Sequence, residues 1–479
     1  MGFGYATVTP SATSVAQVGA AAVWTYPQRS LTDIQSLVAA IQNNDPSLLS
    51  TLSDILYVPA PYFAGQVSAT QVAAFLDNLV LNYGLAGPVA AAISASPYGL
   101  WSTNFVTQVV PYMSATSIAQ ALYSGQMDAN HAQLILYYMA QNYYYNKWIY
   151  TITANAPSSL TFSTDVTLST NVLIAQNITV ASGVTVTCGT HTCFFVAQSF
   201  NNQGTVVAYG APGGAPASVV IENYGGTGGG GIVVVAITAA LGTLNVSGSP
   251  GGTAVDCAGS PGSGGIGGTG AFYVVTGVTV PLGGTGGYAL YNVTYYGGVA
   301  GINGGGGGAC DSNYQGATGG VSVVFLLGNP NAMVTYVLQG LSDWWLINVL
   351  GKAPSSTTPL TFMYGSGGGA GAQYTGYQAG GGGGGGAGEV VVYGYNIMSG
   401  TIDAVGGNGG AAYSCGSGNN AGGGGGGGGG LAFIFYGATS GNVTANVAGG
   451  AGGVGSSSIF TGLTGAPGTA YIAAVTVNG

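Results

Sequence analysis

Three side chains that can bind a metal or act in nucleophilic catalysis lie within six residues, at Cys188, His191 and Cys193. Zinc usually takes four protein ligands in a structural site, and no second ligand cluster accompanies this one in the sequence. A cysteine nucleophile needs a base and a group that orients the base, and no Asp or Glu is adjacent to His191. The segment is therefore open to three interpretations: a metal site, a disulfide or free thiols.

Five cysteines lie near turns or glycine tracts, all of them after residue 150. Cys257, Cys310 and Cys415 follow similar loop contexts, which favours cross-links between neighbouring repeats. All five, including Cys188 and Cys193, are candidates for disulfides, and spacing alone does not decide the connectivity.

Carboxylates that cleave a glycosidic bond have to work as a pair, and a β-solenoid enzyme would gather them in one groove. The acidic residues after residue 150 are scattered, and the one basic residue there is Lys352. The second histidine, His131, lies near the start of a predicted helix, and we interpret it as structural. The glycine runs match G-x-G-x-x-G by chance, and no Lys-Ser or Lys-Thr of a phosphate-binding loop follows them. We therefore predict neither an enzyme nor a cofactor or metal site.

Charged residues make up 3% of the 479 residues, and the net charge is −9. The basic residues are Arg29, Lys147 and Lys352, whereas phosphate binding needs clusters of Lys and Arg. We expect no nucleic-acid partner and no binding to an anionic membrane surface. No apolar run reaches the roughly 18 residues of a membrane span, and the first residues lack the basic and apolar regions of a signal peptide.

This shortage of carboxylates predicts tolerance to acid. Acid unfolds proteins mainly by protonating carboxylates that are paired in the native state, and this chain has only 12 acidic residues to protonate. We expect the melting temperature to stay nearly constant from pH 6 to pH 3, as measured by thermal unfolding. A steep fall over that range would contradict the prediction.

Residues 31–150, which follow an N-terminal segment at 1–30, show the apolar spacing of helices. Ser114 and Asp128 are predicted to begin helices, because their side chains can accept hydrogen bonds from the first N–H groups. We predict a small bundle of five or six helices. The last of them is expected to run from Asp128 through the tyrosine-rich segment that follows.

From about Tyr150 the apolar period changes to two, which is typical of short strands. We predict the first part of a β-solenoid over 151–340 and glycine-rich β repeats over 366–479. Between them, residues 341–365 contain Trp344 and Trp345, and we expect a loop or short helix that covers the solenoid or forms a subunit contact. The predicted apolar strands are Val219–Ile221, Ile232–Ile237, Phe272–Val280, Val321–Leu327, Glu389–Tyr393, Leu431–Tyr436 and Tyr471–Val477.

Residues 380–453 contain one unit twice: a polyglycine run, an apolar strand, a turn, a short alternating strand and Gly-Gly-x-Gly-Gly. Repeated units bury their apolar faces by stacking on one another. Glycine runs such as 422–430 are also typical of flexible linkers. Because the runs occupy the same place in each repeat, we favour extended polyglycine helices with three residues per turn, packed side by side.

Four Asn-x-Ser/Thr sequences are candidates for N-glycosylation, although such tripeptides also arise by chance in this composition. They begin at Asn177, Asn245, Asn292 and Asn442.

The segment V-W-x-Y-x-x-R-x-L-T, which includes Trp24, Tyr26 and Arg29, resembles a short sequence motif of viral structural and fibre proteins. The resemblance implies a virion component whose N-terminal region contacts other virion proteins; an ordinary helix start with Trp24 and Tyr26 in the core is the alternative. The strand pattern after residue 150 resembles that of parallel β-helices, and the glycine tracts resemble those of phage tail-tip adhesins. Together they imply an α+β multidomain fold, with a small helical bundle followed by a glycine-rich parallel β-solenoid.

From these features we predict a non-enzymatic tail-fibre or spike protein on the virion surface, which attaches to a glycan or surface-layer protein of the host. The composition suggests an acid- and heat-tolerant archaeal virus and a homo-oligomer. A cellular surface filament or adhesin subunit is the alternative, and a β-helix enzyme that degrades polysaccharides is a third.

Overall fold

The computed structural model describes residues 69–95, 105–188, 192–208, 226, 228–253, 273–275, 278–280, 329–358, 381–412, 421–456 and 460–479. The chain divides into two compact units. The helical unit comprises Met1–Asn155, Thr335–Leu360 and Val477–Gly479, and the β unit comprises Ala156–Val334 and Thr361–Thr476.

In the helical unit, two helices begin at the predicted caps. The Ser114 side chain accepts a hydrogen bond from the backbone N–H of Ser117, and that of Asp128 accepts from Asn130 and His131. Helix α8 contacts α5, α6 and α10. Helices in the described residues before 160 include α5 (Ala69–Leu81), α6 (Ala86–Ala95), α8 (Ala115–Tyr123), α9 (Ala129–Gln141) and α10 (Tyr145–Thr153).

The prediction of one continuous helix after Asp128 is wrong. Helix α9 ends at Gln141 and α10 begins at Tyr145. Between them Tyr143 has a φ of 64°, in the left-handed region that an α-helix does not use. The break changes the direction of the chain, so the tyrosine-rich segment contributes to two helices.

The tryptophan-containing segment, predicted as a loop or short helix at 341–365, begins within a helix, and residues Thr335–Leu360 belong to the helical unit. Helix α11 (Pro330–Asn348) buries Val337, Leu338, Leu341 and Trp345 at helical spacing. The Trp345 ring packs edge-on against Tyr123 with the ring centroids 5.3 Å apart. An apolar face of this length is buried most readily against other helices, although the segment lies almost 200 residues after them in the chain. Within the described parts of the chain, no helix is both long and apolar enough to cross a bilayer.

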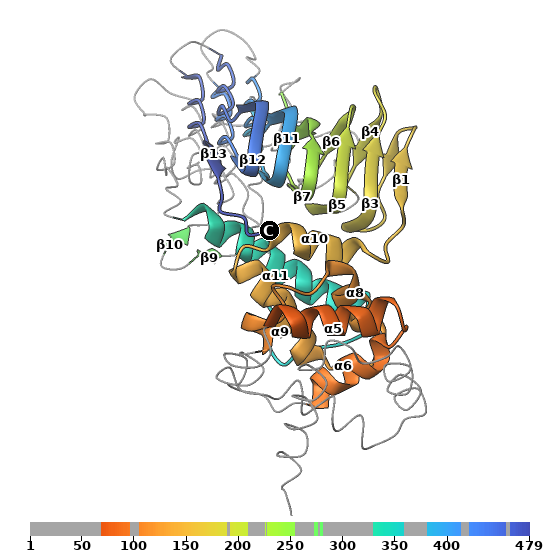
Figure 1. The fold of residues 1–479 in the computed structure, drawn as a ribbon. Coiled ribbons are helices and arrows are strands. Elements are labelled where there is room, and N and C mark those ends of the chain that lie inside the picture. The colour runs from red at the N-terminus through yellow and green to blue at the C-terminus, as the bar shows by residue number, and fades with distance from the viewer. Residues whose placement is uncertain are drawn as a thin grey trace, which may run out of the picture. The chain divides into compact units, whose positions relative to one another are not determined.

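The β unit is built on one 11-stranded sheet in which the strands pair in parallel (Figure 1). The first row of strands is β1 (Ser159–Phe162), β3 (Val172–Val180), β5 (Thr192–Asn202), β7 (Gly231–Ala240), β11 (Glu389–Asp403), β12 (Leu431–Asn446) and β13 (Thr469–Ala474). The second row is β2 (Val166–Thr167), β4 (Thr185–Thr187), β6 (Thr205–Val207), β8 (Gly242–Asn245) and the second halves of β11 and β12.

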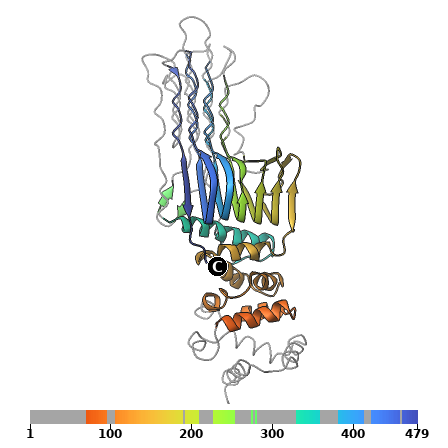
Figure 2. The same cartoon turned by 45° about the horizontal axis from the view of Figure 1, so that its top comes forward.

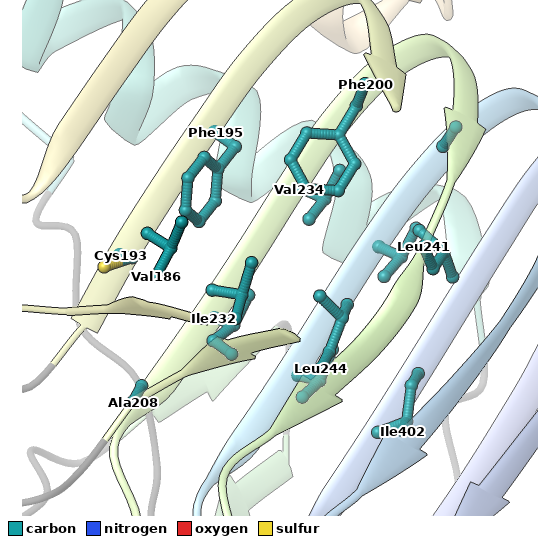
Figure 3. Packing of buried hydrophobic residues seen from close by; sticks show 14 of the residues in the cluster. Val186, Cys193, Phe195, Phe200, Ala208, Ile232, Val234, Leu241, Leu244 and Ile402 are labelled. Atoms are coloured by element: carbon teal, nitrogen blue, oxygen red, sulfur yellow. The ribbon is translucent and has the colours of Figure 1, made fainter. Parts of the chain in front are cut away.

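The long strand β11 joins the two rows. Its first half pairs with β7 and its second half pairs with β8, so the sheet bends and nearly closes into a solenoid-like shape. Side chains from both rows point into the space inside this bend, where they form one buried apolar cluster. Figure 3 shows Phe195 and Val234 of the first row in this cluster with Val186 and Leu244 of the second. Burial of this inner face is what holds the rows together.

The predicted repeat strand Phe272–Val280 is not part of the parallel sheet. Strands β9 (Tyr273–Val275) and β10 (Val278–Val280) form a separate antiparallel pair. The two residues between them can close only an antiparallel hairpin, because parallel neighbours need a long crossover. Strand β7 therefore pairs directly with β11. The predicted strands Val219–Ile221 and Val321–Leu327 lie outside the described residues.

Candidate functional site

The first predicted cluster is a disulfide in the structure. Cys188 and Cys193 are bonded to each other, and both side chains are buried in the inner cluster of the β unit. A bonded pair offers neither a nucleophile nor a thiolate ligand, so the disulfide interpretation holds for this pair. His191 lies outside the described residues. The part of the chain that the structure describes holds no group of three His, Cys, Asp or Glu side chains able to bind a metal ion.

The predicted N-glycosylation sites that the structure describes lie on strands. Asn177 on β3 and Asn442 on β12 are exposed, and Asn245 on β8 is half-buried. The Asn177 side chain donates to the Ser158 carbonyl at 2.8 Å, and that of Asn245 accepts from the Ser247 N–H at 2.9 Å. Predicted residues outside the described ranges are Trp24, Tyr26, Arg29, Cys257, Asn292, Cys310 and Cys415.

Both lysines are used to hold backbone carbonyls in the helical unit. The Lys147 ammonium donates to the carbonyls of Val110 and Pro111, and burial lowers the pKa of this lysine. The Lys352 ammonium donates to the carbonyls of Gly125 and Met127, at 2.9 and 2.5 Å. These cations therefore stabilise helix ends and do not form a basic patch for an anionic ligand.

A buried carboxylate organises the polar interior of the helical unit. Asp343 on α11 is 2% exposed and accepts three hydrogen bonds. The donors are the side-chain amide of Gln133 at 2.6 Å, the hydroxyl of Tyr137 at 2.5 Å and the backbone N–H of Thr358 at 2.5 Å. The Gln133 amide also donates to the Ser356 carbonyl at 2.7 Å. The network ties α9 to α11 and to the segment after it, and sequence reasoning missed it because its members lie more than 200 residues apart.

This network predicts a loss of stability in alkali. Burial, followed by the hydrogen bond to Asp343, raises the pKa of Tyr137 far above its usual 10. The folded state therefore keeps the Tyr137 proton at a pH where the unfolded chain has lost it. Its contribution to stability is complete below pH 10 and falls as the pH rises above that value.

We expect the melting temperature of the helical unit to fall above pH 10, and to fall less in Tyr137→Phe, measured by calorimetry from pH 8 to pH 11. The phenylalanine variant has no proton to lose at this position, so the difference isolates Tyr137 from the other tyrosines and from Lys147. Parallel curves for the two proteins would contradict the prediction.

The most extensive backbone arrangement in the β unit consists of glycine-rich segments that continue the strands, called here the glycine array. Figure 2 shows these segments as thin coils that run side by side beyond the strands. The array comprises residues 246–252, 381–388, 404–412, 421–430, 447–454 and 460–468.

Hydrogen bonds within the glycine array advance in steps of three residues. In segment 421–430, one set of N–H groups points to segment 460–468, the next set points to segment 404–412, and a third set of residues accepts from segment 381–388. The donor–acceptor pairs are Gly423–Phe460, Gly426–Leu463 and Gly429–Ala466; Gly424–Gly410, Gly427–Gly407 and Gly430–Ala404; and Gly381–Gly422, Gly384–Gly425 and Ala387–Gly428. A period of three matches an extended helix with three residues per turn, whose backbone groups face its neighbours.

Close packing explains why these positions are glycine. A Cβ on Gly424 would lie 2.0 Å from the carbonyl oxygen of Gly382, and one on Gly427 would lie 2.0 Å from that of Gly385. No side chain fits at such distances from a neighbouring backbone. The array therefore depends on the absence of side chains, and its lateral hydrogen bonds offset the entropy that ordering glycine costs.

Along each strand, the side chains on the outer face of the sheet change from buried and apolar to exposed and polar. On β12, Phe433 and Phe435 near the start are buried, whereas Thr439 and Thr444 towards the end are exposed. The same change recurs on neighbouring strands in register, which aligns polar side chains from coil to coil.

Three polar ladders result, each defined by residues that pair across adjacent strands. The serine–asparagine ladder is Ser159, Asn177, Ser199, Thr238, Asn396 and Thr439. The threonine ladder is Thr185, Thr205, Thr243, Thr401 and Thr444. The mixed ladder is Thr167, Thr187, Val207, Asn245, Asp403 and Asn446, in which the buried Val207 interrupts the polar side chains.

Comparison with protein-family models, with curated proteins and with solved structures finds no significant match to this chain. Its function therefore has to be inferred from its own geometry.

Proposed function

We propose that this chain is a non-enzymatic structural protein of a virion, a tail fibre or spike that attaches the particle to the host surface. In this proposal the N-terminal region and a small helical bundle join the protein to other virion proteins. A glycine-rich parallel β-solenoid with packed polyglycine helices is exposed on the virion surface, in a homo-oligomer. The virus is one of an acid- and heat-tolerant archaeal host.

The observation that carries this proposal is the hydrogen bonding of the glycine array in steps of three. Each segment is held laterally by several neighbours through backbone groups that do not titrate. A glycine array of this kind resists bending and does not depend on ion pairs. Both properties suit a fibre or spike that projects from a particle and touches a host surface. The array also suits an acidic environment, in which carboxylate pairs would be protonated.

The roles of four of the six carboxylates in the described residues support a structural role over an enzymatic one. Asp77 accepts from the Ser114 N–H at 2.9 Å, and Asp165 accepts from the Thr185 N–H at 2.7 Å. Asp128 caps α9, and Asp343 accepts three hydrogen bonds inside the helical unit. Each of these groups stabilises the backbone or the helix packing.

The proposal is tested by locating the chain. Antibodies against the purified protein, combined with gold labelling and electron microscopy, are expected to mark the surface of purified virus particles. Mass spectrometry of the same particles should recover the chain, and the purified protein should bind intact host cells. Label along filaments of cells that produce no particles would overturn the viral assignment in favour of a cellular adhesin. Particles that lack the chain would overturn it as well.

A further inference from the structure

We infer that the threonine and mixed ladders, which alternate with inward side chains on the same second-row strands, form one binding face for a neutral, hydroxyl-rich polysaccharide. This inference rests on the proposed attachment function and names the chemical class of the surface that is bound. Both ladders lie on the outer side of the second row of strands, whereas the serine–asparagine ladder lies on the first row and is not part of this face. None of the ladder residues belongs to the glycine array.

The ladders repeat one chemistry at one spacing. Parallel strands lie about 4.8 Å apart, so consecutive members of a ladder present their polar groups at that interval. All five members of the threonine ladder carry a hydroxyl, which both donates and accepts. A ligand that repeats its own hydroxyl groups along a chain can engage several rungs at once.

The polar groups are held in place before any ligand binds. Threonine is β-branched, and its χ1 angle is stiff in a strand. The Thr444 hydroxyl donates to that of Thr401 at 3.4 Å, and on the first row the Thr439 hydroxyl donates to the side-chain oxygen of Asn396 at 2.9 Å. Preorganisation of this kind reduces the entropy lost on binding.

The ladders are accessible to a large ligand. Thr401, Thr444 and Asn446 are exposed, and Thr185 and Thr243 are partly exposed. The positions between the threonine and mixed ladders point inward instead. Ile402 and Leu244, for example, belong to the buried cluster. The inward side chains fix the register, and the outward ones remain available.

Charge decides which polymer fits. Among all ladder residues, Asp403 is the one carboxylate, and there is no Lys or Arg. An anionic polymer would find no cation on this face, and a cationic polymer would find a single carboxylate. Uncharged hydroxyl and amide groups suit a neutral polysaccharide, which binds through many weak contacts whose combined avidity is high.

The test uses the full chain and measures its binding to two insoluble neutral polysaccharides, cellulose and mannan. Heparin and chitosan beads serve as anionic and cationic comparators. The wild type is expected to bind at least one neutral polymer more tightly than either charged one. The triple variant Thr205→Val, Thr243→Val and Thr401→Val keeps the β-branched shape, removes three hydroxyls and is expected to bind about tenfold to a hundredfold more weakly.

The matched control places the same exchange on exposed threonines away from the ladders: Thr116→Val, Thr461→Val and Thr464→Val. It is expected to bind like the wild type. If the ladder triple variant fails to fold, Thr444→Lys with Asn446→Lys replaces it. Both of those side chains are exposed at the end of their ladders, and the bulky cations should block the face without disturbing the core.

Binding to heparin or chitosan alone, no binding to either neutral polymer, or equal binding by folded ladder variants and wild type would overturn the inference. Host-cell binding separates this inference from the proposed function. Ladder variants that still bind host cells like the wild type would overturn the role of the ladders and leave the attachment function standing. Absence of the chain from virions would overturn the attachment function, even if the ladders bound cellulose or mannan.

Discussion

The variant Gly427→Ala is expected to destabilise the β unit by about 3–5 kcal/mol, because one methyl group forces two glycine segments apart. The added Cβ would lie 2.0 Å from the carbonyl oxygen of Gly385, which is backbone and cannot rotate away. Gly427 also donates to Gly407 and accepts from Gly450, both at 2.8 Å. Moving the segment to relieve the clash would lengthen both hydrogen bonds and leave buried backbone groups without partners.

Denaturant unfolding, followed by a signal from the strands, measures this effect. Two controls accompany it. Ala451→Ser changes an exposed position of the same array and is expected to alter stability by less than about 0.5 kcal/mol. Gly87→Ala repeats the glycine exchange in helix α6, where the new Cβ would meet only the Gln126 side chain at 3.6 Å, and is expected to be neutral or slightly stabilising. Stability of Gly427→Ala within 1 kcal/mol of wild type would show that the segments are not closely packed.

The second large effect is expected from Asp343→Ala in the helical unit. This substitution removes the acceptor of the Thr358 N–H and one acceptor each from the Gln133 amide and the Tyr137 hydroxyl. The Asp343 side chain that they contact is 2% exposed. Unsatisfied buried donors cost about 1–3 kcal/mol each, and partial rearrangement reduces the sum, so we expect a loss of about 3–5 kcal/mol. Helix α11 should then separate from α9, because this carboxylate connects them.

Thermal unfolding followed by far-ultraviolet circular dichroism checks this prediction. Tyr137→Phe removes a single donor and should cost less than Asp343→Ala. Asp165→Ala removes an exposed carboxylate that accepts one backbone hydrogen bond and should cost about 1 kcal/mol or less. Equal stability of Asp343→Ala and Asp165→Ala would mean that the buried network does not hold the helices together.

Both effects come from backbone and buried polar groups, in a chain with few charges to contribute. The β unit uses glycine where other proteins use side chains, since its neighbouring segments approach closely enough to bond laterally. We therefore expect the stability of the β unit to change little with pH and to fall strongly when a single packed glycine is replaced. The acid-tolerance measurement and the Gly427→Ala measurement test the two sides of this expectation.

Local features of the fold were predictable from the sequence. The apolar runs at Ile232, Glu389, Leu431 and Tyr471 lie in parallel strands β7, β11, β12 and β13, because short apolar runs that follow glycine or turn residues are typical of strands. The caps at Ser114 and Asp128 begin helices, because the hydrogen bonds that define a cap span only a few residues. The pairing of Glu389 with Leu431 follows from the repeated unit at 380–453.

Long-range partners were decided by the tertiary structure. The run Phe272–Val280 has strand composition, yet a two-residue turn makes it a hairpin outside the sheet. The segment that contains Trp345 carries a helical apolar face, but no local signal places it beside helices almost 200 residues earlier. The polar ladders arise only when β4, β6, β8, β11 and β12 align in register. Composition and periodicity reflect interactions among residues a few positions apart, so they determined the strands, caps and glycine runs of this protein. The pairing of distant segments depends instead on which surfaces fit together when the whole chain is packed.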